Sequence, residues 1–137
     1  MNQRLPVIAV VDDEESVRRA LGRLLRSAGF EVEAFAGGRE FLDASDDWRI
    51  DCVILDLHMP PPNGFEVLER LAMRKAQPLA IVLTGHDSPM SRARATASGR
   101  VSQFLAKPID GDVLLQAIHD VTASRQCGRA PSREIKP

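Results

Sequence analysis

The chain has 137 residues, of which 44% are hydrophobic and 27% charged, and its formal net charge is -1. This size and balance are those of one globular domain, because two separate cores would be crowded in so short a chain. The charge is too close to neutral for direct binding to nucleic acid, which usually requires a basic face.

The predicted elements begin with an apolar run, Leu5 to Val11, which is typical of a strand buried on both faces. The run is too short to span a membrane and lacks the cleavage site of a signal peptide, so we expect a cytoplasmic protein. Helical spacing of apolar residues follows from Val17 to Ala28, and Gly29 stands where this helix should stop. Glu31 to Phe35 alternates like a half-buried edge strand, and Gly38 to Ala44 predicts a short helix.

The rest of the chain repeats the order of strand and helix. Cys52 to Leu55, Ala80 to Leu83 and Ser102 to Ala106 predict three more strands. The helices expected after them are marked by the apolar residues Phe65, Leu68, Leu71 and Ala72, by the segment Met90 to Ser98, and by Val113, Leu114, Ala117, Ile118 and Val121.

Five repeats of strand and helix predict an α/β fold with a doubly wound, five-stranded parallel sheet of order 2-1-3-4-5, as in flavodoxin-like folds. We expect the domain to span residues 1–123 and residues 124–137 to form a polar, flexible tail. The two cysteines, Cys52 and Cys127, do not suggest a disulfide framework, so reduced thiols are expected.

Polar residues collect at the ends of four of the predicted strands. Asp12 and Asp13 follow the first strand, Asp56 ends the third, Thr84 ends the fourth and Lys107 ends the fifth. The carboxyl ends of parallel strands share one edge of the sheet, which is where ligands bind in such folds. One Asp after a strand is often only a helix cap, but agreement among four strand ends predicts a site.

Three neighbouring carboxylates repel one another, so they should either hold protons or recruit a cation. The ligands are oxygen atoms without Cys or His at metal-ligand spacing, which favours Mg²⁺ and disfavours zinc. A metal together with Lys107 and Thr84 could stabilise phosphoryl transfer onto Asp56, which would become an aspartyl phosphate.

The sequence resembles the receiver domains of bacterial two-component response regulators, over roughly residues 5 to 123. The motifs that carry the resemblance are Asp12-Asp13, Asp56-Leu57-His58-Met59-Pro60 followed by Gly64, Thr84-Gly85, and Phe104-Leu105-Ala106-Lys107-Pro108. The stretch Thr84-Gly85-His86 and the pair Pro89-Met90 are similar to regulators of the nitrogen-fixation type.

The resemblance implies a phosphorelay switch in which Asp56 accepts a phosphoryl group from a sensor histidine kinase or a phosphotransfer protein. It also implies that Asp13, Asp56 and the main-chain carbonyl of His58 ligate Mg²⁺, with Asp12 acting through water. Such a protein takes part in its own phosphorylation and dephosphorylation and is not an enzyme toward other substrates.

By the same resemblance, Lys107 pairs with the phosphate, Thr84 moves to hydrogen-bond it, and Phe104 turns inward as Thr84 moves. The Lys107-Pro108 bond is expected to be cis. The surface of the fourth helix, the fifth strand and the fifth helix is expected to contact a downstream protein, and phosphorylation-dependent dimerisation is left open.

Some residues depart from the family pattern or add to it. Pro60, Pro61 and Pro62 should stiffen the loop after Asp56, with Asn63-Gly64 as a turn that admits positive φ. His58 and His86 stand two residues after Asp56 and Thr84, and they are either exposed polar side chains or groups that tune the lifetime of the aspartyl phosphate. Arg92 and Arg94 should point to different sides of their helix, so they cannot form one patch.

Three alternatives were weighed. A phosphohydrolase that uses Asp56 would generally carry a second Asp where this chain has His58, and it would need a cap segment. An FMN carrier would need a Ser, Thr or Gly phosphate loop in place of the acids after the first strand. The residues after the last helix are too few for a helix-turn-helix unit, so this chain is not expected to read DNA itself. Because the tail is polar and ends without the start of another periodic segment, we expect a stand-alone receiver, with the excised input domain of a DNA-binding transcription regulator as the alternative.

Overall fold

The computed structural model describes residues 5–45, 50–74 and 78–128, and the account below concerns these residues. Strands and helices alternate along them. In chain order the elements are β1 (Val7–Val11), α1 (Glu15–Ser27), β2 (Glu31–Phe35), α2 (Gly38–Ser45), β3 (Cys52–Asp56), α3 (Gly64–Arg74), β4 (Leu79–Thr84), α4 (Pro89–Thr96), β5 (Val101–Ala106) and α5 (Gly111–Gly128).

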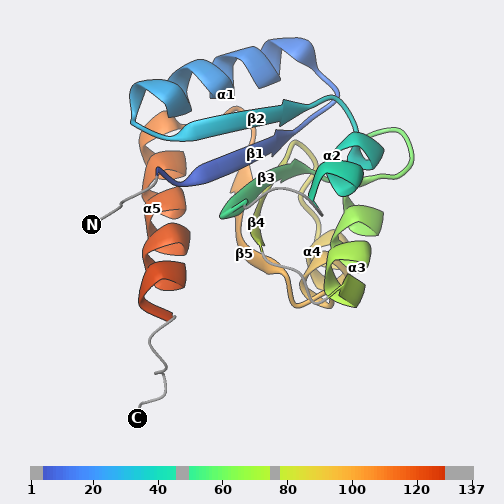
Figure 1. Ribbon diagram of the computed structural model, residues 1–137. Helices are drawn as coiled ribbons and strands as arrows, with labels where there is room; N and C mark the ends of the chain where they lie inside the picture. The colour runs from blue at the N-terminus through green and yellow to red at the C-terminus, as the bar shows by residue number, and fades with distance from the viewer. Residues whose placement is uncertain (1–4, 46–49, 75–77, 129–137) are drawn as a thin grey trace.

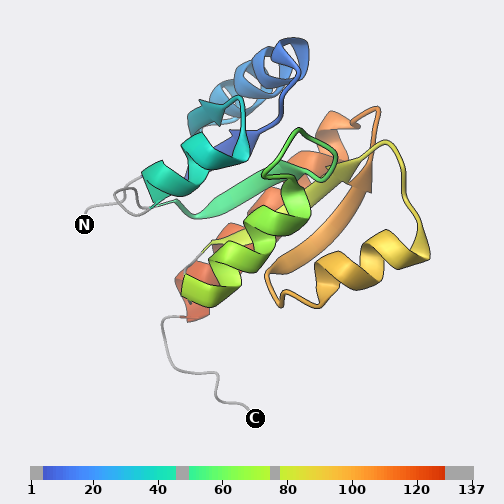
Figure 2. The same cartoon turned by 90° about the vertical axis from the view of Figure 1, so that its right-hand side faces the viewer.

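The five strands form one parallel sheet in the order β2-β1-β3-β4-β5, which confirms the expected fold class. Helices α1 and α5 cover one face of the sheet, and α2, α3 and α4 cover the other (Figures 1 and 2). The winding therefore changes direction between β1 and β3, the place where such folds hold their ligands.

The apolar runs become the central strands because both of their faces are covered. Every residue of β1 and β3 is buried, whereas in the edge strand β2 only Val32 is buried and the other residues are exposed or half-buried. Leu21 and Leu25 of α1 pack on one face, and Leu68 and Leu71 of α3 pack on the other. Burial of each such side chain contributes about 1.5–3 kcal/mol, so the sheet is a firm support for the residues at its edge.

Two of the strand ends carry their polar residues as expected. Asp56 and Thr84 are the last residues of β3 and β4, because backbone pairing continues one residue beyond each apolar run. Gly29 has a φ of 94° directly after α1, as expected for a helix stop.

The last helix is longer than expected, since α5 continues to Gly128 and includes the first residues of the expected tail. Residues 129–137 of that tail lie outside the described residues. Cys52 is buried in β3, while the side chain of Cys127 lies outside the described ones. In the described part of the chain, none of the helices combines the length and the apolar character needed to cross a bilayer.

Candidate functional site

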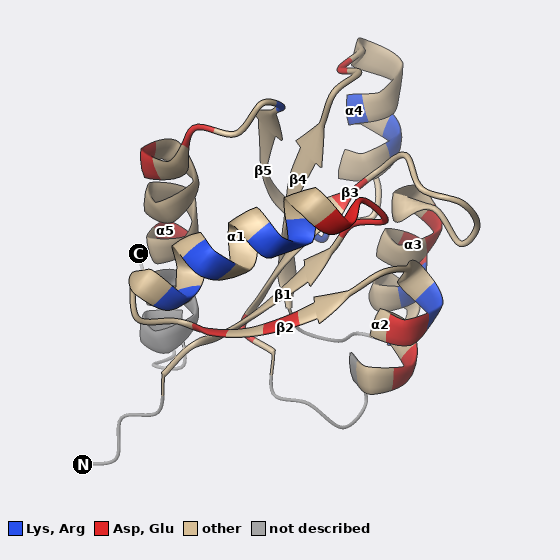
Figure 3. Cartoon of the chain, turned by 90° about the horizontal axis from the view of Figure 1, so that it is seen from above, with Lys and Arg blue, Asp and Glu red and all other residues tan. Residues whose placement is uncertain are grey.

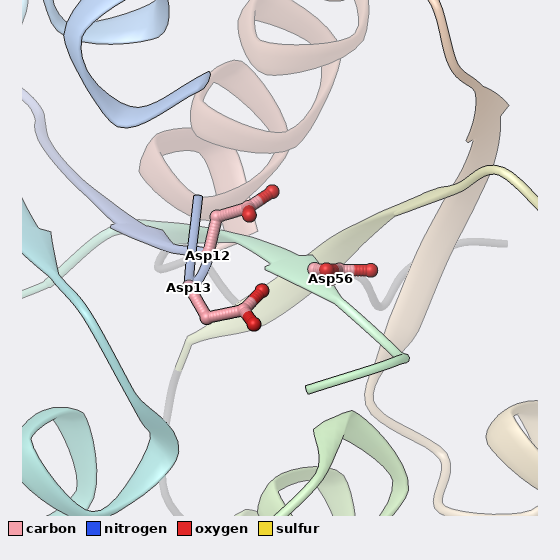
Figure 4. Close-up of side chains that lie close together, drawn as sticks. All are labelled: Asp12, Asp13 and Asp56. Carbon is pink, nitrogen blue, oxygen red and sulfur yellow. The ribbon is translucent and has the colours of Figure 1, made fainter. Parts of the chain in front are cut away.

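Three carboxylates meet where β1 and β3 end. Asp12 and Asp13 directly follow β1 and Asp56 closes β3, and one oxygen of each lies within 4.8 Å of the others (Figure 4). Asp12 and Asp56 are buried, with 2% and 6% of their surface exposed, whereas Asp13 is exposed. The parallel strands therefore bring together the carboxylates that lie far apart in the sequence.

Lys107 supplies the positive charge for this cluster. Its Nζ atom lies 3.1 Å from Oδ2 of Asp12, 3.6 Å from Oε1 of Glu14 and 3.7 Å from Oδ2 of Asp56. The Lys107-Pro108 bond is cis, as expected. Glu14 was not anticipated from the sequence, although its place beside the Asp pair was a signal that could have been used.

Burial and charge act on the two central groups in opposite ways. Burial raises the pKa of Asp56 above its ordinary value, and the charges of Asp12 and Asp13 add to that rise. The backbone N–H of His58 and the charge of Lys107 act against it without cancelling it. For Lys107, burial acts to lower the pKa, but the hydrogen bond to Asp12 and the neighbouring carboxylates raise it overall. The site is therefore short of positive charge.

The backbone around Asp56 is held from two sides. The N–H of His58 donates to Oδ1 of Asp56 over 3.2 Å, and the N–H of Gly64 donates to the carbonyl of Leu57 over 3.0 Å. A Cβ atom at Gly64 would lie 2.5 Å from the carbonyl oxygen of Asp56 and 2.5 Å from Cα of Leu57. Glycine is needed at this position because the two segments approach so closely.

Gly64 is needed for this close approach and not for a positive φ. The Asn63-Gly64 pair was expected to form a turn with positive φ, but among the described glycines only Gly29 and Gly99 have a positive φ. Asn63 instead caps α3: its Oδ1 accepts from the N–H of Glu66 over 3.0 Å, and its own N–H donates to Oε1 of Glu66 over 2.8 Å. The spacing of Asn and Glu was a capping-box signal in the sequence.

Thr84 ends β4 next to the cluster and is 3% exposed. Its Oγ1 accepts from the N–H of His86 over 3.0 Å and donates to the carbonyl of His86 over 3.1 Å. The N–H of Lys107 donates to the Thr84 carbonyl over 3.0 Å, which ties β4 to the end of β5. In this arrangement the Thr84 hydroxyl is bonded within its own loop.

The two histidines at the rim contact each other. The side chains of His58 and His86 are both exposed, and their ring centroids lie 5.9 Å apart with the planes at 72°. His58 also lies edge-on to Phe65, at 6.2 Å between centroids. Exposure agrees with the simpler expectation for both residues, and the contact between them was not foreseen.

Arg92 and Arg94 leave α4 in different directions, as expected. The guanidinium of Arg92 lies over the ring of Phe104 in β5, with Cζ 4.7 Å from the centroid. The guanidinium of Arg94 lies over Phe65 at 4.3 Å, on the side of α3. Phe104 is half-buried, so part of its ring is open to this contact.

The donor set fits a hard divalent cation. Oxygen atoms of Asp12, Asp13 and Asp56 converge, and the Lys107 ammonium pairs with the carboxylates of Asp12 and Asp56, whereas the Arg18 guanidinium donates to the main-chain carbonyl of Asp12 over 2.7 Å. Acidic residues lie where β1 and β3 end, near the basic residues that run along α1 (Figure 3). Such a set of carboxylates suits Mg²⁺, which keeps several of its waters and takes one or two carboxylates.

Comparisons with known proteins agree with this geometry. A family model for the response regulator receiver domain matches residues 8–119. The transcriptional regulatory protein FixJ of Azorhizobium caulinodans is 36% identical over 118 residues, which are 86% of this chain and 55% of that protein. The response regulator protein TodT of Pseudomonas putida is 36% identical over 134 residues, which are 96% of this chain and 58% of that protein.

One solved structure is matched over nearly its whole length. The chemotaxis protein CheY4 of Vibrio cholerae matches with a TM-score of 0.81 and 32% sequence identity, and the match covers 86% of this chain and 99% of that one. The chain spans little more than half the length of the two curated relatives above, yet it covers almost all of this structure.

Proposed function

The chain belongs to the receiver domain family of response regulators, and from that premise we propose that Asp56 accepts a phosphoryl group and makes the domain a phosphorylation switch. The observation that carries the proposal is the position of the Asp56 carboxylate, which lies within 4.8 Å of two further carboxylates and 3.7 Å from an ammonium group. This combination of an oxygen nucleophile and charged neighbours suits phosphoryl transfer.

The donor is a sensor histidine kinase or a phosphotransfer protein. A carboxylate oxygen of Asp56 bonds to phosphorus while the phosphorus–nitrogen bond of the donor phosphohistidine breaks. The electron pair of that bond stays on the imidazole nitrogen of the donor. The switch is turned off by hydrolysis. Water attacks phosphorus, the bond between phosphorus and the Asp56 oxygen breaks, inorganic phosphate leaves, and the carboxylate is restored.

A magnesium ion would be held by Asp13, Asp56 and the main-chain carbonyl of His58, with Asp12 bound through water. When bound, it would neutralise charge that develops on the oxygens of the transferring group. The three carboxylates of Asp12, Asp13 and Asp56 outnumber the one ammonium, that of Lys107, which the described ion pairs place against them, and this excess of negative charge supports the assignment.

Lys107 and Thr84 would complete the switch. The Lys107 ammonium lies between Asp12 and Asp56 and would pair with the phosphoryl oxygens. The Thr84 hydroxyl would leave its bonds to His86 and donate to a phosphoryl oxygen, and Phe104 would then turn inward. Two added negative charges and a few charge-assisted hydrogen bonds can supply the roughly 5.5 kcal/mol needed to reverse such an equilibrium.

We infer that the output is read on the surface of α4, β5 and α5 by a protein partner. As a stand-alone receiver the domain would bind that partner directly; the alternative is the input part of a longer regulator, as in relatives named transcriptional regulatory proteins. The mass of the native protein distinguishes the two. A phosphorylation-dependent dimer is a further outcome that sedimentation of the phosphorylated domain would detect.

His58 and His86 are proposed to tune the lifetime of the aspartyl phosphate, because their exposed rings meet beside Asp56 and Thr84. Replacing each with Ala should change the rate of dephosphorylation, measured from about pH 6 to pH 8. His119 is the matched control, since its ring packs on Phe30 at 5.4 Å and the residue lies on α5. Unchanged rates in the first two variants would remove this role.

The main test is labelling with acetyl phosphate and Mg²⁺, followed by mass spectrometry. We expect one added phosphoryl group on Asp56 of the wild type, none on Asp56→Asn, and slow labelling of Asp13→Asn. Asp43→Asn removes an exposed carboxylate on α2 and should be labelled like the wild type. Equal labelling of Asp56→Asn and wild type would overturn the proposal.

A further inference from the structure

The N-terminal turn of α4 is tied to β5 by three side chains. The guanidinium of Arg92 donates two hydrogen bonds to the carboxylate of Asp87. Its Nε atom donates to Oδ1 over 2.9 Å, and its Nη2 atom donates to Oδ2 over 2.9 Å. The same guanidinium lies over the ring of Phe104 at 4.7 Å. Two parallel hydrogen bonds fix the plane of a guanidinium, so Asp87 determines how Arg92 meets the ring. We call these three residues the Asp87–Arg92–Phe104 clamp.

The clamp is connected to Thr84 through the backbone. Asp87 is the third residue after Thr84, and the Thr84 hydroxyl bonds to both the N–H and the carbonyl of His86, which directly precedes Asp87. At the other end, Phe104 pairs with Val82 in the β4–β5 register, two residues before Thr84. A continuous set of contacts therefore joins the hydroxyl at the rim to the ring between α4 and β5.

We propose that the clamp holds Phe104 in its present position and that Asp87 and Arg92 are positioning residues for the switch. The inference rests on the proposed function and deepens it. If the Thr84 hydroxyl leaves the His86 backbone for a phosphoryl oxygen, the segment that presents Asp87 loses two hydrogen bonds. Arg92 then loses its fixed plane, and the ring of Phe104 is released.

The direction of the effect follows from this arrangement. Contacts that stabilise only one of two conformations shift the equilibrium toward that conformation. The clamp is made while Thr84 is bonded within its own loop, so it opposes the conformation in which Thr84 reaches Asp56. Weakening the clamp should therefore make Asp56 easier to phosphorylate.

The chain offers a matched control on the same helix. Arg94 also lies over a phenylalanine ring, that of Phe65 at 4.3 Å, and it pairs with Glu69 at 3.8 Å. The side chains of Arg92 and Arg94 are 51% and 52% exposed. The contacts of Arg94 run to α3, whereas those of Arg92 run to Asp87, in the loop after Thr84, and to Phe104 of β5.

The experiment compares initial rates of Asp56 phosphorylation by acetyl phosphate with Mg²⁺. We expect Arg92→Gln and Asp87→Asn to react about three- to tenfold faster than the wild type, in line with the loss of one partly exposed cation–π contact and its ion pair. Arg94→Gln should stay within about twofold of the wild type. In a Phe104→Leu background the effect of Arg92→Gln should vanish, since the guanidinium then has no ring.

A second readout does not depend on phosphorylation. The ring-proton NMR signals of Phe104 should shift in unphosphorylated Arg92→Gln and stay in place in Arg94→Gln. Equal acceleration in both arginine variants, no acceleration in either, or an Arg92 effect that survives in the Phe104→Leu background would each overturn the clamp. A wild type that is not labelled at Asp56 would overturn the proposed function, and the role of the clamp with it.

Discussion

Asp56 occupies a position that is unfavourable for a charged carboxylate. Burial raises its pKa, Asp12 and Asp13 add to the rise, and the hydrogen bond from His58 and the charge of Lys107 compensate only in part. A carboxyl whose pKa is higher in the folded state than in the unfolded one destabilises the fold once it is ionised. The reactivity proposed for Asp56 therefore comes with a loss of stability at neutral pH.

We predict that Asp56→Asn stabilises the metal-free domain by about 1 kcal/mol at pH 7, because a neutral amide removes the cost of burying the charge. The Oδ1 atom of the amide can still accept from the N–H of His58. The free energy of unfolding, measured by urea denaturation with a chelator present, checks this. A variant that is less stable than the wild type would contradict the prediction.

The dependence on pH has a defined sign. Below the ordinary pKa of 3.8, Asp56 is protonated in both states and its penalty is absent. As the pH rises through the interval between 3.8 and the raised pKa of the folded state, the folded protein retains a proton that the unfolded chain has lost. The contribution of Asp56 to the free energy of unfolding falls through this interval, so the advantage of Asp56→Asn should appear there and vanish in stronger acid.

Gly64 should tolerate no side chain. A Cβ atom would lie 2.5 Å from backbone atoms of Asp56 and Leu57, which cannot rotate away as a side chain could. We predict that Gly64→Ala destabilises the domain by about 1–3 kcal/mol and slows labelling of Asp56. Gly111→Ala is the control, because its Cβ would meet Leu24 at an ordinary 3.5 Å. Similar denaturation midpoints for the two variants would show that the loop can move aside.

At the level of elements, α3 depends on the capping pair Asn63 and Glu66, which exchange two hydrogen bonds across its first turn. We predict that Asn63→Ala costs about 1 kcal/mol of stability, since the N–H of Glu66 loses its acceptor. Asn63→Ser should recover most of this loss, because serine is also a good cap. The measurement is the urea midpoint, and equal midpoints for Ala and Ser would mean that the cap contributes nothing.

The order and type of the elements could be read from the sequence because the relevant signals are local. Continuous apolar runs marked the buried strands, and helical spacing marked α1, α3 and α5. The ends were less accurate, since β1 begins at Val7 although the apolar run begins at Leu5, and α5 continues to Gly128, beyond the apolar residues that marked it. Backbone hydrogen bonding does not begin and end with the apolar side chains, so hydrophobicity alone could not locate these ends.

At the level of the whole molecule, the site could be located because a parallel sheet collects its strand ends at one edge. That rule alone predicts that Asp12, Asp13, Asp56 and Lys107 lie together. The contact of Glu14 with Lys107 and the clamp through Arg92 were missed, since they depend on rotamers and on the angle at which α4 meets β5. Sequence spacing gives the direction of a helical side chain but not the partner that it meets.

The charge of the molecule at this edge leads to the last prediction. Mg²⁺ that binds the folded state and not the unfolded chain adds RT ln(1 + [Mg²⁺]/Kd) to the free energy of unfolding, about 2.7 kcal/mol at one hundred times Kd. We expect thermal unfolding to move to higher temperature as Mg²⁺ is added, and Asp13→Asn to lose most of this shift. Asp43→Asn should keep it, since its carboxylate is exposed on α2. NaCl at equal ionic strength separates binding from screening, and a shift of equal size with either salt would remove the metal from the proposed mechanism.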